Sequence, residues 1–306
     1  MKKELEELYK LEITSLIKLT NKTYKVITSR EEYILKEHDS LNLESIFARI
    51  RILNIDTFVL PLRSIDEHYI VEIEDKYYGL YPYYEDEEEL AKDIRLSFYI
   101  KSIANLHQIS TYPLQVNDGF FEESIAYLDT KISSVKQEIL TRIERVEKEN
   151  YHSPSDWYFL MNYYKIYNAV KEADRYVTLL EEEWKNSSNI HLSLTYQNFS
   201  YDHILVRNRK IISLDKMNIA PTIYDLVDLF NKSIDLKIDV SYLISDYLEI
   251  HKLETYEINW LLAFIFIPKI ERKEDDIEDI KSLYKTLTFI KIAEQIASKF
   301  EEKLIN

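Results

Sequence analysis

Two short strand-like segments interrupt a largely helical stretch of the chain between Leu194 and Leu214. The pattern there is a loop, a strand, a tight link, a second strand, and then a loop that opens a helix at Asp225. Helical patterns continue on both sides of this insert. The chain is therefore expected to fold into a class whose helical part contains a central strand pair.

In the first 83 residues the sequence pattern is different and is typical mostly of strands. Residues 23–28 and 32–37 alternate polar and apolar side chains across a short turn, which favours an antiparallel hairpin. Apolar residues at helical spacing predict a helix over 42–53 and a short amphipathic one over 3–9. Further strand-like segments occur at 58–62, 68–73 and 77–81. The expected order of the main elements is β-β-α-β-β-β.

Long helical patterns dominate the rest of the chain, at 90–108, 122–150, 157–184 and from 225 onward. The change of texture near 82–89 carries no Gly/Ser linker, so two lobes that pack together are expected. The predicted class is α+β, with a β-rich lobe over 1–83 and an α-rich lobe over 84–306.

Composition excludes several classes of function. The net charge of −15 would repel a phosphate backbone, so nucleic acid is not an expected partner. The chain has no cysteine, which excludes thiol catalysis and zinc–thiolate sites. The longest apolar run, 260–268, is too short for membrane insertion, and the first residues lack the apolar core of a signal peptide. Cytoplasmic synthesis is therefore expected.

Five motifs, in chain order, resemble kinases of the aminoglycoside-phosphotransferase type. They are LTNKTYKV at 19–26, YILK at 33–36, YYGLYPYY at 77–84, IANLHQ at 103–108 and YDL at 224–226. The resemblance covers nearly the whole chain. It implies a two-lobed protein-kinase-like fold with a small antiparallel β lobe and a larger, mainly helical lobe that contains a catalytic loop over 195–226.

Active relatives would carry a base Asp, a metal-binding Asn and a metal-binding Asp along this loop. The matching positions here hold Asn198, His203 and Ser213. An amide is not basic, imidazole prefers softer metals than Mg²⁺, and serine brings no carboxylate. The resemblance therefore implies a kinase scaffold whose catalytic groups are degenerate.

Two nearby carboxylates are candidate replacements. Asp202 is a possible displaced base, since it lies four residues past Asn198. Asp215 is a possible substitute metal ligand, because on a strand it would point to the same side as Ser213, about 6–7 Å away. Both replacements are needed together for catalysis.

Lys36 matches the strand lysine that contacts nucleotide phosphates in active relatives, where it pairs with a glutamate on the lobe helix, here Glu44. The alternative is an ordinary surface lysine on a strand. No cofactor is required by a degenerate site, and ATP and Mg²⁺ are expected only if nucleotide binding is retained.

Within this superfamily, the chain resembles the spore-coat kinase-like proteins of endospore-forming Firmicutes, the CotS group and its YsxE branch. That branch shows a degenerate HGxxSxxHxL, which Ser200 and His203 match and from which Tyr196 departs. The resemblance implies a place in the spore coat, a role in sporulation and partners among spore-coat proteins. The oligomeric state stays open.

Three functions remain open. The favoured one is a catalytically degenerate kinase-fold protein, or pseudokinase, with a structural or scaffolding role. The second is an active ATP-dependent small-molecule phosphotransferase, similar to aminoglycoside or choline kinases, that uses Asp202 and Asp215. The third is a sensor that binds nucleotide without turnover. Tyr196 and Gln197 replace the His-Gly of active relatives, which predicts a narrower catalytic end.

Overall fold

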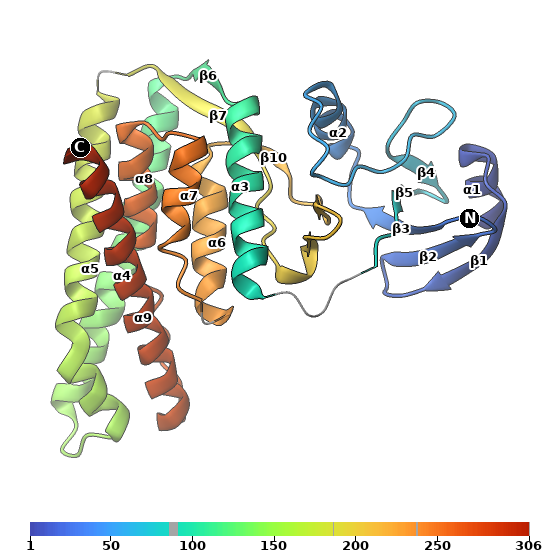
Figure 1. Cartoon of the computed structure of the whole chain (residues 1–306). Helices are drawn as coiled ribbons and strands as arrows, with labels where there is room; N and C mark the ends of the chain where they lie inside the picture. Colours follow the sequence, from blue (N-terminus) through green and yellow to red (C-terminus); the bar gives the residue numbers. More distant parts are fainter. Residues whose placement is uncertain (86–90, 186, 237, 306) are drawn as a thin grey trace. The chain divides into compact units, whose positions relative to one another are not determined.

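An antiparallel five-stranded sheet organises the N-terminal part of the computed structural model, which describes residues 1–85, 91–185, 187–236 and 238–305 (Figure 1). The chain divides into two compact units. The first combines 1–111 with 193–220, and the second combines 112–192 with 221–306. The lobe boundary expected at 83/84 stays a prediction, and residues 86–89 of the expected lobe junction lie outside the described residues.

The strand order in the sheet is β1-β2-β3-β5-β4. Its members are β1 (Ile13–Lys18), β2 (Thr23–Thr28), β3 (Glu32–His38), β5 (Lys76–Pro82) and β4 (Val71–Ile73). One face of the sheet is the core of this part of the unit, where Val26, Leu35 and Leu80 are almost fully buried against Leu5 of α1 (Lys2–Tyr9). The opposite face carries the side chains of the candidate site.

Most expected elements of this region are confirmed, with ends that differ by no more than one residue. They are the strands at 23–28, 32–37 and 77–81 and the helices at 3–9 and 42–53, the latter being α2 (Leu43–Ile52). The expected order was wrong, because three strands rather than two precede α2.

Of two further expected strands, the one at 58–62 was wrong and the one at 68–73 was wrong in part. Residues 58–62 form no strand, only a parallel bridge from Phe58 to Ile211, and Pro61 has no N–H to give to a ladder. The segment 68–73 is a strand only from Val71, because the N–H groups of Tyr69 and Ile70 donate to the Glu44 carboxylate instead of to a neighbouring strand.

The first unit also contains α3 (Lys92–Ser110), the short helix η1 (Tyr201–His203) and the strands β8 (Ile204–Leu205), β9 (Lys210–Ile211) and β10 (Asn218–Ala220). Residues 193–195, the end of β7 (Asn189–Thr195), pair with β10. Tyr99 of α3 packs its ring against Tyr196 and Phe199, at centroid distances of 6.1 and 4.8 Å. This aromatic contact fixes the start of the loop after β7.

Long helices build the second unit (Figure 1). They are α4 (Asp118–Lys148), α5 (Pro154–Trp184), α6 (Ile223–Leu236), α7 (Leu243–Ile250), α8 (Thr255–Ile265) and α9 (Asp276–Ile305), with the strand β6 (Tyr112–Gln115). The helices expected at 122–150 and 157–184 are confirmed as α4 and α5, which begin a few residues earlier. Ser153 caps α5 through a capping box with Asp156, and Pro154 is its first residue.

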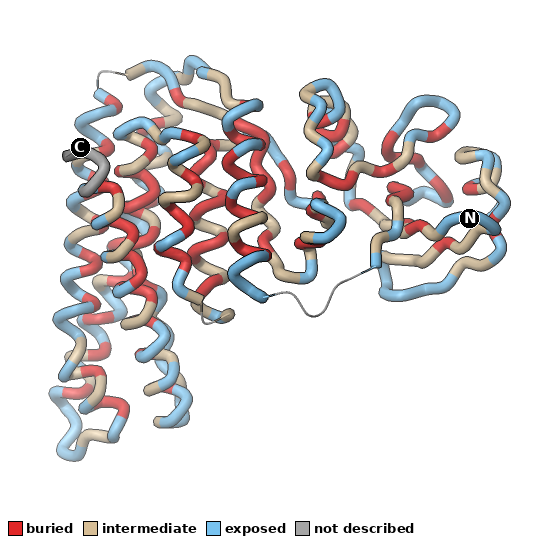
Figure 2. The backbone as a smooth tube through the Cα atoms, in the orientation of Figure 1, coloured by how far each residue is buried: buried red, intermediate tan, exposed pale blue. Residues whose placement is uncertain are grey.

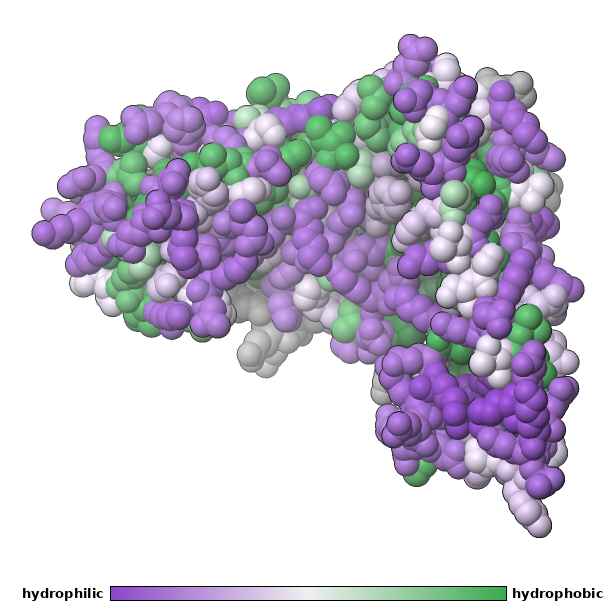
Figure 3. All heavy atoms as spheres, turned by 180° about the vertical axis from the view of Figure 1, so that it is seen from behind, coloured by the Kyte–Doolittle hydropathy of each residue, from purple (hydrophilic) through white to green (hydrophobic). Residues whose placement is uncertain are grey.

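Buried residues recur along the inner sides of these helices, where α5 packs against α4, α8 and α9 (Figure 2). Arg142 of α4 and Asp279 of α9 form an ion pair inside this packing. The end of the α4–α5 hairpin is covered mostly by hydrophilic side chains (Figure 3). No helix within the described residues is both long and apolar enough to cross a membrane.

Candidate functional site

Lys36, His38, Tyr81 and Asp215 form one polar network on the second face of the sheet. Lys36 and His38 are two residues apart on β3, so both side chains leave the strand on the same side. The Lys36 ammonium donates to Asp215 Oδ2, and His38 Nδ1 lies 3.5 Å from Asp215 Oδ1. On the other edge of the imidazole, Nε2 lies 3.0 Å from the Tyr81 hydroxyl. Asp215 is therefore the carboxylate that neutralises Lys36.

The protonation states in this network follow from burial. Burial lowers the pKa of His38, although the Asp215 charge partly opposes the effect. Burial raises the pKa of Tyr81 well above its ordinary value. At neutral pH the phenol thus keeps its proton and donates to Nε2 of a neutral imidazole, which leaves the ring hydrogen on Nδ1, facing Asp215.

Gly79 makes room for the network. It lies opposite Lys36 in the β3–β5 register and between His38 and Tyr81 in space. A Cβ atom at Gly79 would lie 2.9 Å from Tyr81 Cε2 and 3.1 Å from His38 Nε2. One of the two glycines of the chain thus stands where two side chains cross the sheet face.

Glu44 does not pair with Lys36, which corrects the expected contact. Its carboxylate accepts hydrogen bonds from the N–H groups of Tyr69 at 3.0 Å and Ile70 at 2.8 Å. His68 Nδ1 lies 3.8 Å from the same carboxylate. Glu44 therefore holds the segment before β4 against α2.

The three positions at which the sequence predicts degenerate catalytic groups, Asn198, His203 and Ser213, are bonded to one another. Asn198 Nδ2 donates to the Ser213 carbonyl at 2.8 Å. His203 Nδ1 lies 2.9 Å from the Asn198 carbonyl and 3.0 Å from the Tyr196 hydroxyl, which itself donates to the Ile212 carbonyl at 2.7 Å. A carbonyl only accepts, so Nδ1 carries the hydrogen of the neutral ring, and burial lowers the pKa of His203. These side chains hold the segments 196–203 and 212–213 together.

Three residues of the loop over 195–226 have left-handed backbones, with φ of 48° at Gln197, 53° at Arg209 and 62° at Ser213. Gln197 Nε2 donates to Thr195 Oγ1 at 2.9 Å and to Asn218 Oδ1 at 3.1 Å. The conformation of Ser213 shows that 212–215 is not a strand, so the geometry expected for Ser213 and Asp215 was wrong. Asp202 is exposed on η1.

A cavity of about 290 Å³ opens beside the Lys36–Asp215 pair, within the first unit. Its walls are mostly apolar and come from Thr23, Ile34, Lys36, Val59, residues 81–84, Leu205 and residues 212–215. This volume is close to the lower end of the range of about 300–1,000 Å³ for small-molecule sites. An apolar slot whose edge ammonium is already paired with a carboxylate is suited mainly to a flat base.

Sequence reasoning assigned no role to His38 or Tyr81. The spacing of two residues from Lys36 was the available signal for His38, since it places both on one strand face. No such signal exists for Tyr81, because its place opposite Ile34 depends on the β3–β5 register. That register becomes visible only when the sheet is formed.

The residues present do not fit a Mg²⁺ ion. Mg²⁺ prefers an octahedral set of oxygen ligands that includes carboxylates. Asp215 already engages Lys36 and His38, and the Ser213 carbonyl accepts from Asn198.

No protein-family model matches the sequence, and neither does any curated protein. Solved structures of low sequence identity do match. An aminoglycoside phosphotransferase from Alicyclobacillus acidocaldarius is similar over 95% of this chain and 94% of its own, with 11% identity and a TM-score of 0.68.

Two further structures extend the comparison. The AMP-bound complex of spectinomycin phosphotransferase has 15% identity and a TM-score of 0.57 over 95% of this chain and 96% of its own. A microcompartment-associated aminopropanol kinase has 13% identity and a TM-score of 0.52 over 97% of both chains. These likenesses confirm the predicted fold class, an α+β protein-kinase-like fold of the aminoglycoside-phosphotransferase type.

Proposed function

We propose that this chain is a catalytically degenerate kinase-fold protein that binds a nucleotide without Mg²⁺ and does not transfer its phosphate. The observation that carries the proposal is the pairing of Asp215, the one carboxylate at the cavity edge among the described lining residues, with Lys36. A carboxylate neutralised in this way is a poor Mg²⁺ ligand.

The loop supports the same conclusion. Asn198 has no basic group for the proton of a substrate hydroxyl, and its amide is held by the Ser213 carbonyl. Loss of a general base alone typically lowers a rate by about 10²–10⁴. For catalysis, Asp202 would have to act as the base in place of Asn198. Asp215 would also have to break its pair with Lys36 and bind a metal ion. The active-phosphotransferase alternative therefore requires two rearrangements at once.

The cavity supports retained binding. Ile34, Val59 and Leu205 supply apolar walls for a base, and Lys36 stands at the edge where a phosphate would lie. One structural neighbour, spectinomycin phosphotransferase, has been solved with AMP bound. A scaffolding role in the spore coat, with coat proteins as partners, remains a proposal supported by the motif at 196–205.

Turnover tests the catalytic half of the proposal. Phosphate release from ATP and transfer to small hydroxyl compounds are measured with Mg²⁺ for the wild type and for Asp215→Asn. We expect the same background rate for both proteins. Mg²⁺-dependent turnover in the wild type that Asp215→Asn abolishes, with unchanged circular dichroism, contradicts the proposal.

A further inference from the structure

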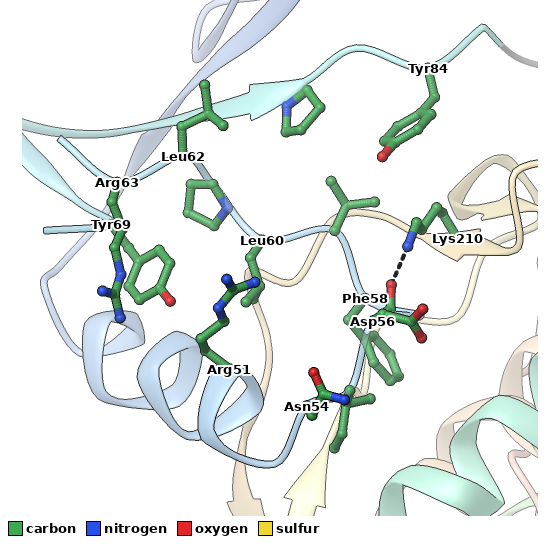
Figure 4. Close-up of a pocket in the computed structure, with 14 residues that line it drawn as sticks. Arg51, Asn54, Asp56, Phe58, Leu60, Leu62, Arg63, Tyr69, Tyr84 and Lys210 are labelled. Carbon is green, nitrogen blue, oxygen red and sulfur yellow. Dashed lines mark hydrogen bonds between the residues drawn. The ribbon is translucent and has the colours of Figure 1, made fainter. Parts of the chain in front are cut away.

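A second cavity, of about 450 Å³, adjoins the first one inside the same unit (Figure 4). Val59, Pro82 and Tyr84 line both cavities. All five residues of the irregular segment 58–62, where the expected strand is missing, line the second cavity, and all five are apolar. The break in the sheet pattern at Pro61 therefore coincides with a hollow in the surface.

Three cationic side chains surround this hollow in a chain whose net charge is −15. Arg51 comes from α2, Arg63 from the segment before β4, and Lys210 from β9. The only acidic residue among the described lining residues is Asp56. The described lining residues therefore carry a net positive charge in a chain that is negative overall, which favours an anionic occupant.

Two of these cations are held in place by the protein. The Arg63 guanidinium lies over the Tyr69 ring, 4.9 Å from its centroid, and pairs with Glu67 at 2.5 Å. Lys210 donates to the Asp56 carbonyl. Their side chains need little further ordering when a ligand binds.

Arg51 is the cation that remains available. No hydrogen bond or ion pair engages its guanidinium within the part of the chain that the structure describes, and the residue is exposed. Figure 4 shows Arg51 and Arg63 at the end of the cavity where Tyr69 lies, with the Tyr69 ring between them in this view, and Lys210 beside Asp56 at the other end. Planar guanidinium groups bind carboxylate and phosphate through paired hydrogen bonds.

We propose that this cavity binds a small organic anion, with its carboxylate or phosphate on Arg51 and Arg63 and its apolar body on the floor formed by Leu60 and Leu62. The site adjoins the proposed nucleotide cavity, but Arg51, Arg63 and Lys210 line only this one, and the proposed binding needs no nucleotide. Its failure and the failure of the proposed function are therefore distinguishable.

Phenyl phosphate is the probe, titrated into the nucleotide-free protein at low salt by isothermal calorimetry. We expect saturable binding of one molecule per chain. Arg51→Gln and Arg63→Gln should each weaken it by about tenfold, the lower end of what a hydrogen bond to a charged group contributes. Arg30→Gln is the matched control, since Arg30 is exposed in the same sheet lobe and does not line the cavity.

Two further probes separate the parts of the ligand. Inorganic phosphate lacks the apolar body and benzyl alcohol lacks the anion, so both should bind more weakly than phenyl phosphate. Circular dichroism melts verify that the exposed arginine variants stay folded. The proposal is overturned if phenyl phosphate shows no saturable binding at millimolar concentration, or if Arg51→Gln and Arg63→Gln bind it as well as Arg30→Gln does.

Discussion

Gln197 and Ser213 carry backbone strain on either side of the short helix η1, with φ of 48° and 62°. A left-handed conformation costs a residue with a Cβ atom about 1–2 kcal/mol. The two hydrogen bonds of the Gln197 side chain, to Thr195 and Asn218, offset part of this cost. Strained residues persist where the surrounding structure holds them, and here the surroundings include the hydrogen-bonded side chains of the same loop.

Comparison of Gln197→Gly with Gln197→Ala isolates the strain. Both variants remove the same side-chain hydrogen bonds, but only alanine keeps a Cβ atom at φ 48°. Glycine avoids the cost of a left-handed Cβ residue, but its greater conformational entropy in the unfolded chain offsets part of this gain. We therefore expect the free energy of unfolding of the glycine variant to exceed that of the alanine variant by about 0.5–1 kcal/mol. Urea unfolding measures the difference. An alanine variant of equal or greater stability would contradict the strained geometry.

The two glycines of the chain predict opposite results. Gly79→Ala places a methyl group against Tyr81 and His38, so we expect a loss of about 1–3 kcal/mol in the free energy of unfolding. Gly119→Ala is the matched control, because its methyl group would meet only Asn117 Oδ1, at 3.4 Å, in the first turn of α4. Alanine is the better helix former, so this variant should be as stable as the wild type or slightly more so. Similar losses in both variants would argue against the crowded face at Gly79.

Single residues of the site were only partly predictable. Lys36 and Asp215 stand out in the sequence by their motif positions, but nothing there indicates that they pair with each other, since they lie 179 positions apart along the chain. Glu44 was a reasonable partner for Lys36 by its place on the helix. The free N–H groups of Tyr69 and Ile70, which compete for its carboxylate, could not be foreseen without the path of that segment.

At the scale of elements, the periodicity of apolar residues was sufficient to predict the position of a strand or helix wherever one of its faces is buried. The strands at β2, β3 and β5 and the helices α4 and α5 have such faces, and their positions follow from the sequence. The segment 58–62 is apolar too, yet Pro61 and the bridge from Phe58 to Ile211 leave it irregular. The left-handed Ser213 interrupts another expected strand, because its φ of 62° lies outside the β region.

The contact between β7 and α8 predicts a pH dependence of stability. The Glu257 carboxylate, 3.9 Å from His191 Nδ1, raises the pKa of His191 above its ordinary value. A pKa raised by folding means that the ion pair stabilises the protein fully below the unfolded pKa of about 6.5 and loses this effect as the pH rises through the folded pKa.

His191→Gln removes the titrating group and keeps the backbone N–H that donates to the Tyr256 hydroxyl at 2.8 Å. Because the pair is partly exposed, we expect the free energy of unfolding of the variant to be lower than that of the wild type by no more than about 1 kcal/mol at pH 5.5. The difference should be smaller at pH 8.5. Urea unfolding across this range gives the difference at each pH. A difference that stays constant, or grows toward pH 8.5, would contradict the role of the ion pair.

At the scale of the whole molecule, the order of motifs along the chain was enough to predict the fold class. The same order could not indicate whether nucleotide binding survives, because that depends on the shape of one cavity and on the partner of one lysine. The net charge of −15 indicates which part of a nucleotide should supply the affinity. Without Mg²⁺ to screen it, a polyphosphate is repelled by such a chain, so the base should supply most of the affinity.

The most direct test of the central claim is thermal unfolding with AMP or ATP, each with and without Mg²⁺. At 100 times its Kd, a ligand stabilises the folded state by about 2.7 kcal/mol. We predict that AMP raises the unfolding temperature at least as much as ATP does. Mg²⁺ should not change the size of either increase. Ile34→Trp, which fills the cavity, should abolish both increases, whereas Ile17→Trp on exposed β1 should not. A shift that requires Mg²⁺ and ATP together, or no nucleotide shift at all, would contradict the account.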